Sequence, residues 1–119
     1  MAKVLVVDDT AFMRLTIRQI LEGLDHEVIE AKDGLNAISQ FTTYNPDLVI
    51  MDITMPQMDG IEALKEIKKI NAKTKVLMCS AMGQQAKVVE AIEAGASTFI
   101  VKPFQNEKFI ATVNALLSK

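Results

Sequence analysis

The chain has 119 residues, half of them apolar, which is enough for one domain with its own hydrophobic core and too little for two ordinary ones. Its 13 basic and 15 acidic residues give a net charge of −2, which argues against nucleic acid as the main partner, because binding to a phosphate backbone requires a positive excess. The single cysteine, Cys79, favours a reducing, cytoplasmic location. No apolar run is long enough to cross a membrane, so we expect no membrane partner. From the length, we expect residues 1–119 to form one domain.

Five short apolar runs follow one another along the chain, each followed by a segment with helical spacing of apolar residues. The predicted strands are Val4–Val7, Val28–Ala31, Leu48–Met51, Val76–Cys79 and Phe99–Val101. The first, third and fourth runs are apolar throughout, which is typical of strands buried on both faces of a parallel sheet. The second helix is predicted over residues 34–43. The other four have the stripes Met13, Ile17, Ile20, Leu21 and Leu24, then Ile61, Leu64 and Ile67, then Val88, Val89 and Ile92, and finally Phe109, Ile110, Val113, Leu116 and Leu117.

This alternation of strands and helices predicts a doubly wound α/β domain: a five-stranded parallel sheet with five helices and right-handed crossover connections. The strand order expected for such a domain is 2-1-3-4-5, which we take from the general rule for these folds rather than from the sequence. Ligands bind at the carboxyl ends of the strands in sheets of this type. The residues that directly follow each predicted strand are therefore the first candidates for a functional site.

Polar residues of potential chemical use follow four of the five predicted strands. They are Asp8 and Asp9 after the first strand, Asp52 after the third, Ser80 after the fourth and Lys102 after the fifth. Lys32 and Asp33, which follow the second strand, have the character of solvated turn residues. Each polar residue after the other four strands, taken alone, also has an ordinary structural explanation, as a turn acid, a helix cap or a surface lysine. Their meeting at one sheet edge favours a functional site.

Three carboxylates at one point repel one another, by roughly 4 kcal/mol for each pair at about 4 Å and an effective dielectric near 20. They must therefore take up protons, separate or bind a cation, and an oxygen-only ligand set suits Mg²⁺. A carboxylate beside Mg²⁺ can also attack phosphorus and form an aspartyl phosphate. Asp52 is the best candidate for that nucleophile because it follows the central strand. Lys102 and the Ser80 hydroxyl would then bind phosphoryl oxygens.

Several stretches of the sequence match one known family in order and spacing. They are Val6-Val7-Asp8-Asp9, Met51-Asp52-Ile53-Thr54-Met55-Pro56, Met58-Asp59-Gly60, Ser80-Ala81 and Val101-Lys102-Pro103-Phe104. With them, essentially the whole chain resembles the response-regulator receiver family, and most closely its free-standing chemotaxis members. The resemblance implies a flavodoxin-like fold.

The resemblance also implies roles for single residues. Asp8, Asp9, Asp52 and the backbone carbonyl of Thr54 would form the Mg²⁺ site, with Asp9 as a direct ligand. Asp52 would be the phosphoacceptor, and Ser80 and Lys102 would bind its phosphoryl group. Ser80 and Phe99 would form a conformational switch, and the Lys102–Pro103 peptide bond would be cis. Phe99 stands where many members of the family have tyrosine.

The family resemblance implies a protein of a two-component system that takes a phosphoryl group from a histidine kinase and signals by binding, not an enzyme with turnover. For the chemotaxis members the implied target is a flagellar motor switch protein, with a phosphatase as a further partner. A phosphorelay intermediate, passing the phosphoryl group to a histidine phosphotransfer protein, is the alternative. A phosphatase with an aspartate nucleophile usually needs a second acid where Thr54 stands, and a flavin or nucleotide carrier would need a glycine-rich phosphate loop that the sequence lacks.

Overall fold

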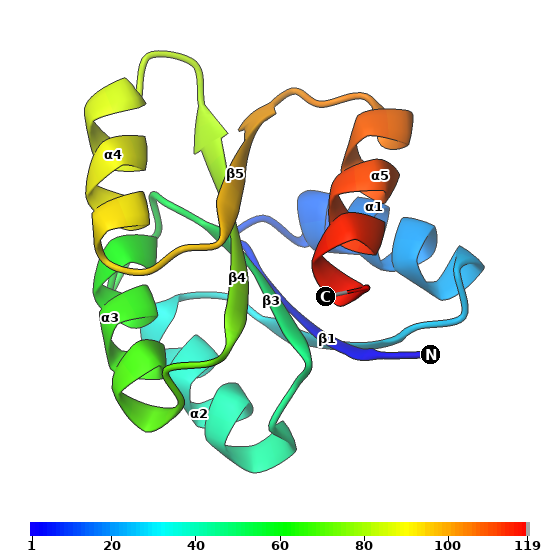
Figure 1. Cartoon of the computed structure of the whole chain (residues 1–119), viewed down its shortest axis with the longest axis horizontal. Coiled ribbons are helices and arrows are strands. Elements are labelled where there is room, and N and C mark those ends of the chain that lie inside the picture. Colours follow the sequence, from blue (N-terminus) through cyan, green and yellow to red (C-terminus); the bar gives the residue numbers. More distant parts are fainter. Residues whose placement is uncertain (119) are drawn as a thin grey trace.

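Five parallel strands run side by side through the centre of the molecule in the computed structural model, which describes residues 1–118 (Figure 1). They are β1 (Lys3–Val7), β2 (Glu27–Ala31), β3 (Leu48–Asp52), β4 (Lys75–Ala81) and β5 (Thr98–Lys102). Their order across the sheet is β2-β1-β3-β4-β5, and every neighbouring pair is parallel. This order confirms the predicted doubly wound topology, and each strand begins and ends within two residues of its predicted bounds.

One helix follows each strand, and the helices cover both faces of the sheet (Figure 1). They are α1 (Ala11–Gly23), α2 (Gly34–Tyr44), α3 (Gly60–Ile70), α4 (Gln85–Glu93) and α5 (Asn106–Leu117). The pair α1 and α5 lies on one face, and α2, α3 and α4 lie on the other. Within residues 1–118, no helix has both the length and the hydropathy that crossing a membrane would require.

Two hydrophobic cores form, one on each face of the sheet, because alternate side chains of a strand point to opposite sides. In β1, Val4 and Val6 belong to the core shared with α1 and α5, whereas Leu5 and Val7 belong to the core shared with α2, α3 and α4. The same alternation runs through β3 and β4. These strands are therefore buried on both faces, which explains why their sequences are continuously apolar.

Aspartate side chains cap two of the helices on the α2–α4 side of the sheet, α2 and α3. The Asp33 carboxylate accepts a hydrogen bond from the Asn36 backbone N–H at 2.7 Å and so caps α2. Asp33 therefore lies in a bend, as predicted, but its half-buried carboxylate caps the helix and is not simply solvated, whereas Lys32 is exposed as predicted. At the start of α3, Asp59 and Glu62 form a reciprocal capping box. These caps fix where each helix begins relative to the strand before it.

Gly60, the first residue of α3, lies directly against the end of β3. A Cβ atom at this position would collide with the backbone carbonyl oxygen of Asp52. The Gly60 N–H donates to the Ile53 carbonyl at 2.7 Å, which closes the loop between β3 and α3. Glycine is therefore required here by close backbone approach, and the tight fit holds the backbone of Asp52 in place.

Candidate functional site

Three aspartates meet at the carboxyl edge of the sheet, and we refer to Asp8, Asp9 and Asp52 as the carboxylate cluster. Asp8 and Asp9 directly follow β1, and Asp52 is the last residue of β3, the neighbouring strand. One carboxylate oxygen from each of the three lies within 4.8 Å of those of the other two. Asp8 and Asp52 are buried, with 3% and 7% of their surface exposed, whereas Asp9 is exposed. The cluster therefore opens to solvent on the side of Asp9.

Lys102, the last residue of β5, reaches the carboxylate cluster from across the sheet edge. Its Nζ atom lies 3.2 Å from Asp52 Oδ2 and 3.5 Å from Asp8 Oδ2. The peptide bond between Lys102 and Pro103 is cis, which confirms the prediction. The sequence thus predicted correctly that strand-end residues far apart in the chain would meet here.

Burial has the largest effect on the pKa of Asp52, and it raises that pKa. The Lys102 cation lowers it, the Asp8 and Asp9 carboxylates raise it, and the balance leaves the Asp52 pKa above its ordinary value. Burial lowers the pKa of Lys102, but Asp52 and Asp8 together raise it above its ordinary value. With the three carboxylates ionised, one ammonium group leaves two negative charges uncompensated.

A divalent cation fits this arrangement of charges and ligands. The donors are all carboxylate oxygens, which suit a hard ion such as Mg²⁺, and two uncompensated negative charges match its charge. Asp9 lies on the exposed side and, among residues 1–118, its carboxylate makes no hydrogen bond or ion pair, so its oxygens are free to bind an ion. Thr54, whose backbone carbonyl is the fourth predicted ligand, follows β3 in the exposed loop beside the cluster.

Asp8 is held by residues that the sequence analysis did not select. Its Oδ1 atom accepts hydrogen bonds from both the N–H and the hydroxyl of Thr10, each at 2.9 Å. Arg14, from the first turns of α1, donates to the Asp8 carbonyl oxygen at 2.6 Å and also pairs with Glu30 at 2.9 Å. The Asp-x-Thr spacing typical of a polar turn could have indicated Thr10. No pattern in the sequence indicates the Arg14 contact, because it depends on how α1 crosses β2.

Ser80 and Phe99 both line one apolar groove. Ser80, near the end of β4, is 1% exposed, and Phe99, in β5, is 42% exposed. The groove has a volume of about 430 Å³ and is lined mainly by the β4–α4 loop, α4 and β5, including Met82, Val88 and Val101. The two predicted switch residues therefore border the same space. Ser80 directly follows Cys79, which lies opposite Asp52 in the register of β3 and β4.

Gln84, also missed by the sequence analysis, connects the two loops beside the cluster. The backbone N–H of Ala81 donates to Gln84 Oε1 at 2.7 Å, and Gln84 Nε2 donates to the Thr54 hydroxyl at 2.8 Å. We call this pair of hydrogen bonds the Gln84 bridge. A lone glutamine before a helix carries no signal for such a contact in a sequence.

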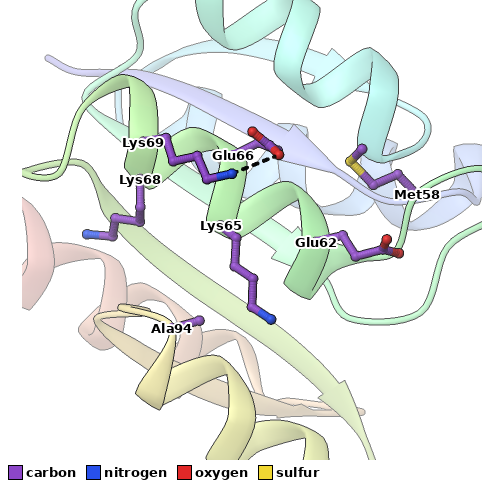
Figure 2. A pocket seen from close by; sticks show the side chains of 7 residues that line it. All are labelled: Met58, Glu62, Lys65, Glu66, Lys68, Lys69 and Ala94. Carbon is purple, nitrogen blue, oxygen red and sulfur yellow. Dashed lines mark hydrogen bonds and ion pairs between the residues drawn. The ribbon is translucent and has the colours of Figure 1, made fainter.

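A second hollow lies on the α3–α4 side and contains none of the predicted site residues (Figure 2). A run of lysines on one helix usually forms a solvated face, and Lys65 and Lys69 are exposed in this way. Lys68 differs: its Nζ atom donates to the backbone carbonyls of Ala72 at 3.2 Å and Thr74 at 2.5 Å. Burial lowers the pKa of Lys68. Its role is to hold the turn between α3 and β4.

Comparisons with known proteins agree with the fold. The family model for the response regulator receiver domain matches residues 4–114. The chemotaxis protein CheY of Bacillus subtilis is 53% identical over 117 residues, which cover 98% of this chain and 98% of that protein. The solved structure of Vibrio cholerae chemotaxis protein CheY4 has a TM-score of 0.92 at 33% identity, over 98% of this chain and 99% of that chain. NtrX from Brucella abortus has a TM-score of 0.94 at 35% identity over 98% of this chain, which spans only 27% of the NtrX chain.

The chain therefore belongs to the response regulator receiver family, whose members act in two-component systems. Within that family it is similar over almost its whole length to chemotaxis proteins. Receiver domains bind Mg²⁺ through an acidic pocket, and the carboxylate cluster of this chain is a group that could hold such an ion. Receiver domains of this kind are typically not turnover enzymes.

Proposed function

We propose that the chain is a response regulator activated by phosphorylation of Asp52, with a histidine kinase as the phosphodonor. The observation that carries this proposal is the position of Asp52, inside a carboxylate cluster and 3.2 Å from the Lys102 ammonium group. A nucleophile that accepts a phosphoryl group needs positive charge close to the oxygens that it will carry. This arrangement provides a lysine and a ligand set for a divalent cation at the same point.

In the proposed reaction, a carboxylate oxygen of Asp52 attacks the phosphorus of a phosphohistidine on the kinase. The P–N bond breaks, and the imidazole nitrogen leaves with the electron pair. Lys102 offsets the charge on the phosphoryl oxygens, and the Ser80 hydroxyl donates a hydrogen bond to one of them. Asp8, held by Thr10, keeps Lys102 in position beside the acceptor.

Mg²⁺ would be held by Asp9, Asp52 and the backbone carbonyl of Thr54, with Asp8 completing the acidic pocket. When bound, it supplies positive charge to the acceptor carboxylate and to the phosphoryl oxygens. Without that charge, the two uncompensated negative charges of the cluster would repel an incoming phosphoryl group. We therefore expect phosphorylation to depend on the metal.

We propose that the output is protein binding, through the groove between α4 and β5. Phosphorylation would draw Ser80 toward Asp52 and allow Phe99 to turn inward, which changes the shape of the groove. The similarity to chemotaxis proteins supports a flagellar motor switch protein as the proposed target. We further propose a phosphatase as a partner and the cytoplasm as the place of action. Thr54 stands where a phosphatase of the aspartate-nucleophile class would place its general acid, which supports a receiver without turnover.

Intact mass spectrometry after incubation with acetyl phosphate and Mg²⁺ tests the proposal. We expect one added phosphoryl group on the wild type, and none on Asp52→Asn or in the presence of EDTA. Asp33→Asn, which changes a carboxylate outside the cluster, is the matched control and should be phosphorylated like the wild type. An unmodified wild type, or a modified Asp52→Asn variant, would contradict the assignment.

The output is tested by measuring the affinity for a flagellar motor switch protein before and after phosphorylation. We expect phosphorylation to strengthen binding, and Phe99→Ala to reduce that gain while leaving Asp52 phosphorylation intact. Transfer of the phosphoryl group to a histidine phosphotransfer protein, without any gain in motor-protein binding, would instead indicate the phosphorelay role.

A further inference from the structure

The Gln84 bridge joins the loop after β3 to the loop after β4 through a single side chain. The amide of Gln84 uses both of its ends: Oε1 accepts from the Ala81 N–H at 2.7 Å, and Nε2 donates to Thr54 Oγ1 at 2.8 Å. Thr54 lies 30 residues from Gln84 in the sequence, so this is a tertiary contact. It ties together two loops that otherwise belong to separate strand–helix units.

Local geometry explains why Gln84 makes this contact. Gly83 has a φ of +89°, a left-handed conformation that turns the chain so that Gln84 lies back over Ala81. Gln84 is the residue before α4, yet its side chain makes no hydrogen bond that caps this helix. Its amide is therefore available to the two loops. A side-chain amide is neutral and offers a donor and an acceptor on separate atoms, as this position requires.

The bridge ends at two residues adjacent to the proposed phosphorylation machinery. Ala81 follows Ser80 in the chain and lies opposite Lys102 in the register of β4 and β5. Thr54 is two residues after Asp52, and its backbone carbonyl is a proposed metal ligand. The bridge therefore connects the side of the site that carries Ser80 with the side that carries the acceptor.

We propose that Gln84 is a positioning residue that holds these two loops together while Asp52 is unphosphorylated, and that the bridge opens when a phosphoryl group occupies Asp52. The Ala81 N–H is a donor at the same strand end as Ser80 and Lys102. A phosphoryl oxygen carries charge and is a stronger acceptor than the neutral carbonyl of a glutamine amide. Exchange of acceptors at Ala81 would free the Gln84 amide from the end of β4 and let it turn away from Thr54, so that both hydrogen bonds of the bridge open.

Release of Gln84 would connect phosphorylation of Asp52 to the groove between α4 and β5, in addition to the movement of Ser80 and Phe99. Gln84 directly precedes α4, and Gln84 and α4 residues line the groove that also contains Phe99. While the bridge is closed, it holds the start of α4 toward Thr54. This inference rests on the proposed function, because it assigns the opening of the bridge to occupation of Asp52.

Binding of beryllofluoride, a mimic of the phosphoryl group, tests the inference by NMR in the presence of Mg²⁺. In the wild type, we expect the side-chain NH₂ signal of Gln84 and the amide signal of Ala81 to change together on binding. Gln84→Ala should bind beryllofluoride about three to ten times more tightly, since two exposed hydrogen bonds no longer need to open. Thr54→Val keeps the backbone carbonyl and removes only the hydroxyl, so it should give part of this gain.

The double variant and a neighbouring glutamine provide the controls. Gln84→Ala combined with Thr54→Val should bind no more tightly than Gln84→Ala alone, because both changes break the same bridge. Gln85→Ala removes an exposed glutamine that is not part of the bridge and should bind like the wild type.

Two different failures are distinguishable. If the wild type binds no beryllofluoride, the proposed function fails and the inference fails with it. If the wild type binds but Gln84→Ala binds equally or more weakly, or the Gln84 signal stays unchanged, the proposed function stands and the bridge is not part of the switch.

Discussion

Replacing Asp52 with asparagine removes one negative charge from the carboxylate cluster with almost no change of shape. We expect this substitution to raise the free energy of unfolding at pH 7 in the absence of divalent cations. The reason is that burial and the neighbouring carboxylates raise the pKa of Asp52, so the ionised form of this side chain is less favourable in the folded protein than in the unfolded chain. A neutral isostere does not carry that cost.

Distances in the structure set the size of the effect. At an effective dielectric of about 20, the attraction between Asp52 and Lys102 at 3.2 Å is about 5 kcal/mol, and the repulsion between Asp52 and Asp8, with oxygens within 4.8 Å, is about 3.5 kcal/mol or more. Repulsion from the exposed Asp9 is smaller because water screens it. These opposing contributions nearly cancel, which leaves the cost of burying the Asp52 charge. We therefore expect Asp52→Asn to raise the free energy of unfolding by about 1–3 kcal/mol.

Urea unfolding in EDTA, with and without added Mg²⁺, measures this gain. Since the folded-state pKa of Asp52 is raised, the gain should be absent below about pH 4, where the carboxyl group is protonated in both states, and should grow as the pH rises. Mg²⁺ should stabilise the wild type more than the variant, because the variant lacks one ligand. Asp33→Asn replaces one good helix-capping residue with another, so the free energy of unfolding should change little. A loss of stability in Asp52→Asn at pH 7 would refute this electrostatic reasoning.

Three further predictions concern the rest of the fold. Gly60→Ala should lose about 2–4 kcal/mol of unfolding free energy in urea, because the new Cβ collides with the carbonyl at the end of β3. The Cys79 thiol should not react with a disulfide reagent in the folded protein at pH 8, because burial raises its pKa to about 12. Burial raises the pKa of Glu30, but hydrogen bonds from two arginines of α1 bring it below its ordinary value. Glu30→Gln should therefore lose about 1 kcal/mol or less at pH 7, discounted for partial exposure, and this loss should disappear as the pH falls below about 4.

Each of these predictions has its own check. Gly23→Ala, at the end of α1 where a Cβ would meet nothing, should be at least as stable as the wild type, and equal effects at both glycines would contradict the steric explanation. Rapid labelling of Cys79 without unfolding would show that β4 opens readily. A pH-independent effect of Glu30→Gln would mean that its charge is not what stabilises the fold.

The sequence predicted the sheet and the core of the site well for a simple physical reason. Strands buried on both faces must be apolar throughout, so β1, β3 and β4 appear as uninterrupted runs with polar residues directly after them. Parallel strands bring those polar residues to one edge, which is how Asp8, Asp52 and Lys102 could be expected to meet.

What the sequence did not reveal are contacts set by the crossing of helices and the path of loops. Arg14 reaches the Asp8 carbonyl only because of how α1 lies over the sheet. The Gln84 contact depends on the left-handed backbone of Gly83, and the Lys68 contacts depend on the turn after α3. In each case a common polar residue type makes a specific contact that has no periodic or composition signal.

The close packing of Gly60 against the end of β3 divides the site into a fixed half and an adaptable half. Ile53, the residue after Asp52, is tied on both sides: its N–H donates to the Cys79 carbonyl at 3.1 Å, and its carbonyl accepts from Gly60. The capping box of Asp59 anchors the same loop from the other end. Asp52 is therefore held in a fixed position, and any conformational adjustment of the site takes place in the loop after β4. Sequence changes that retune the response without losing the acceptor should accumulate in that second loop.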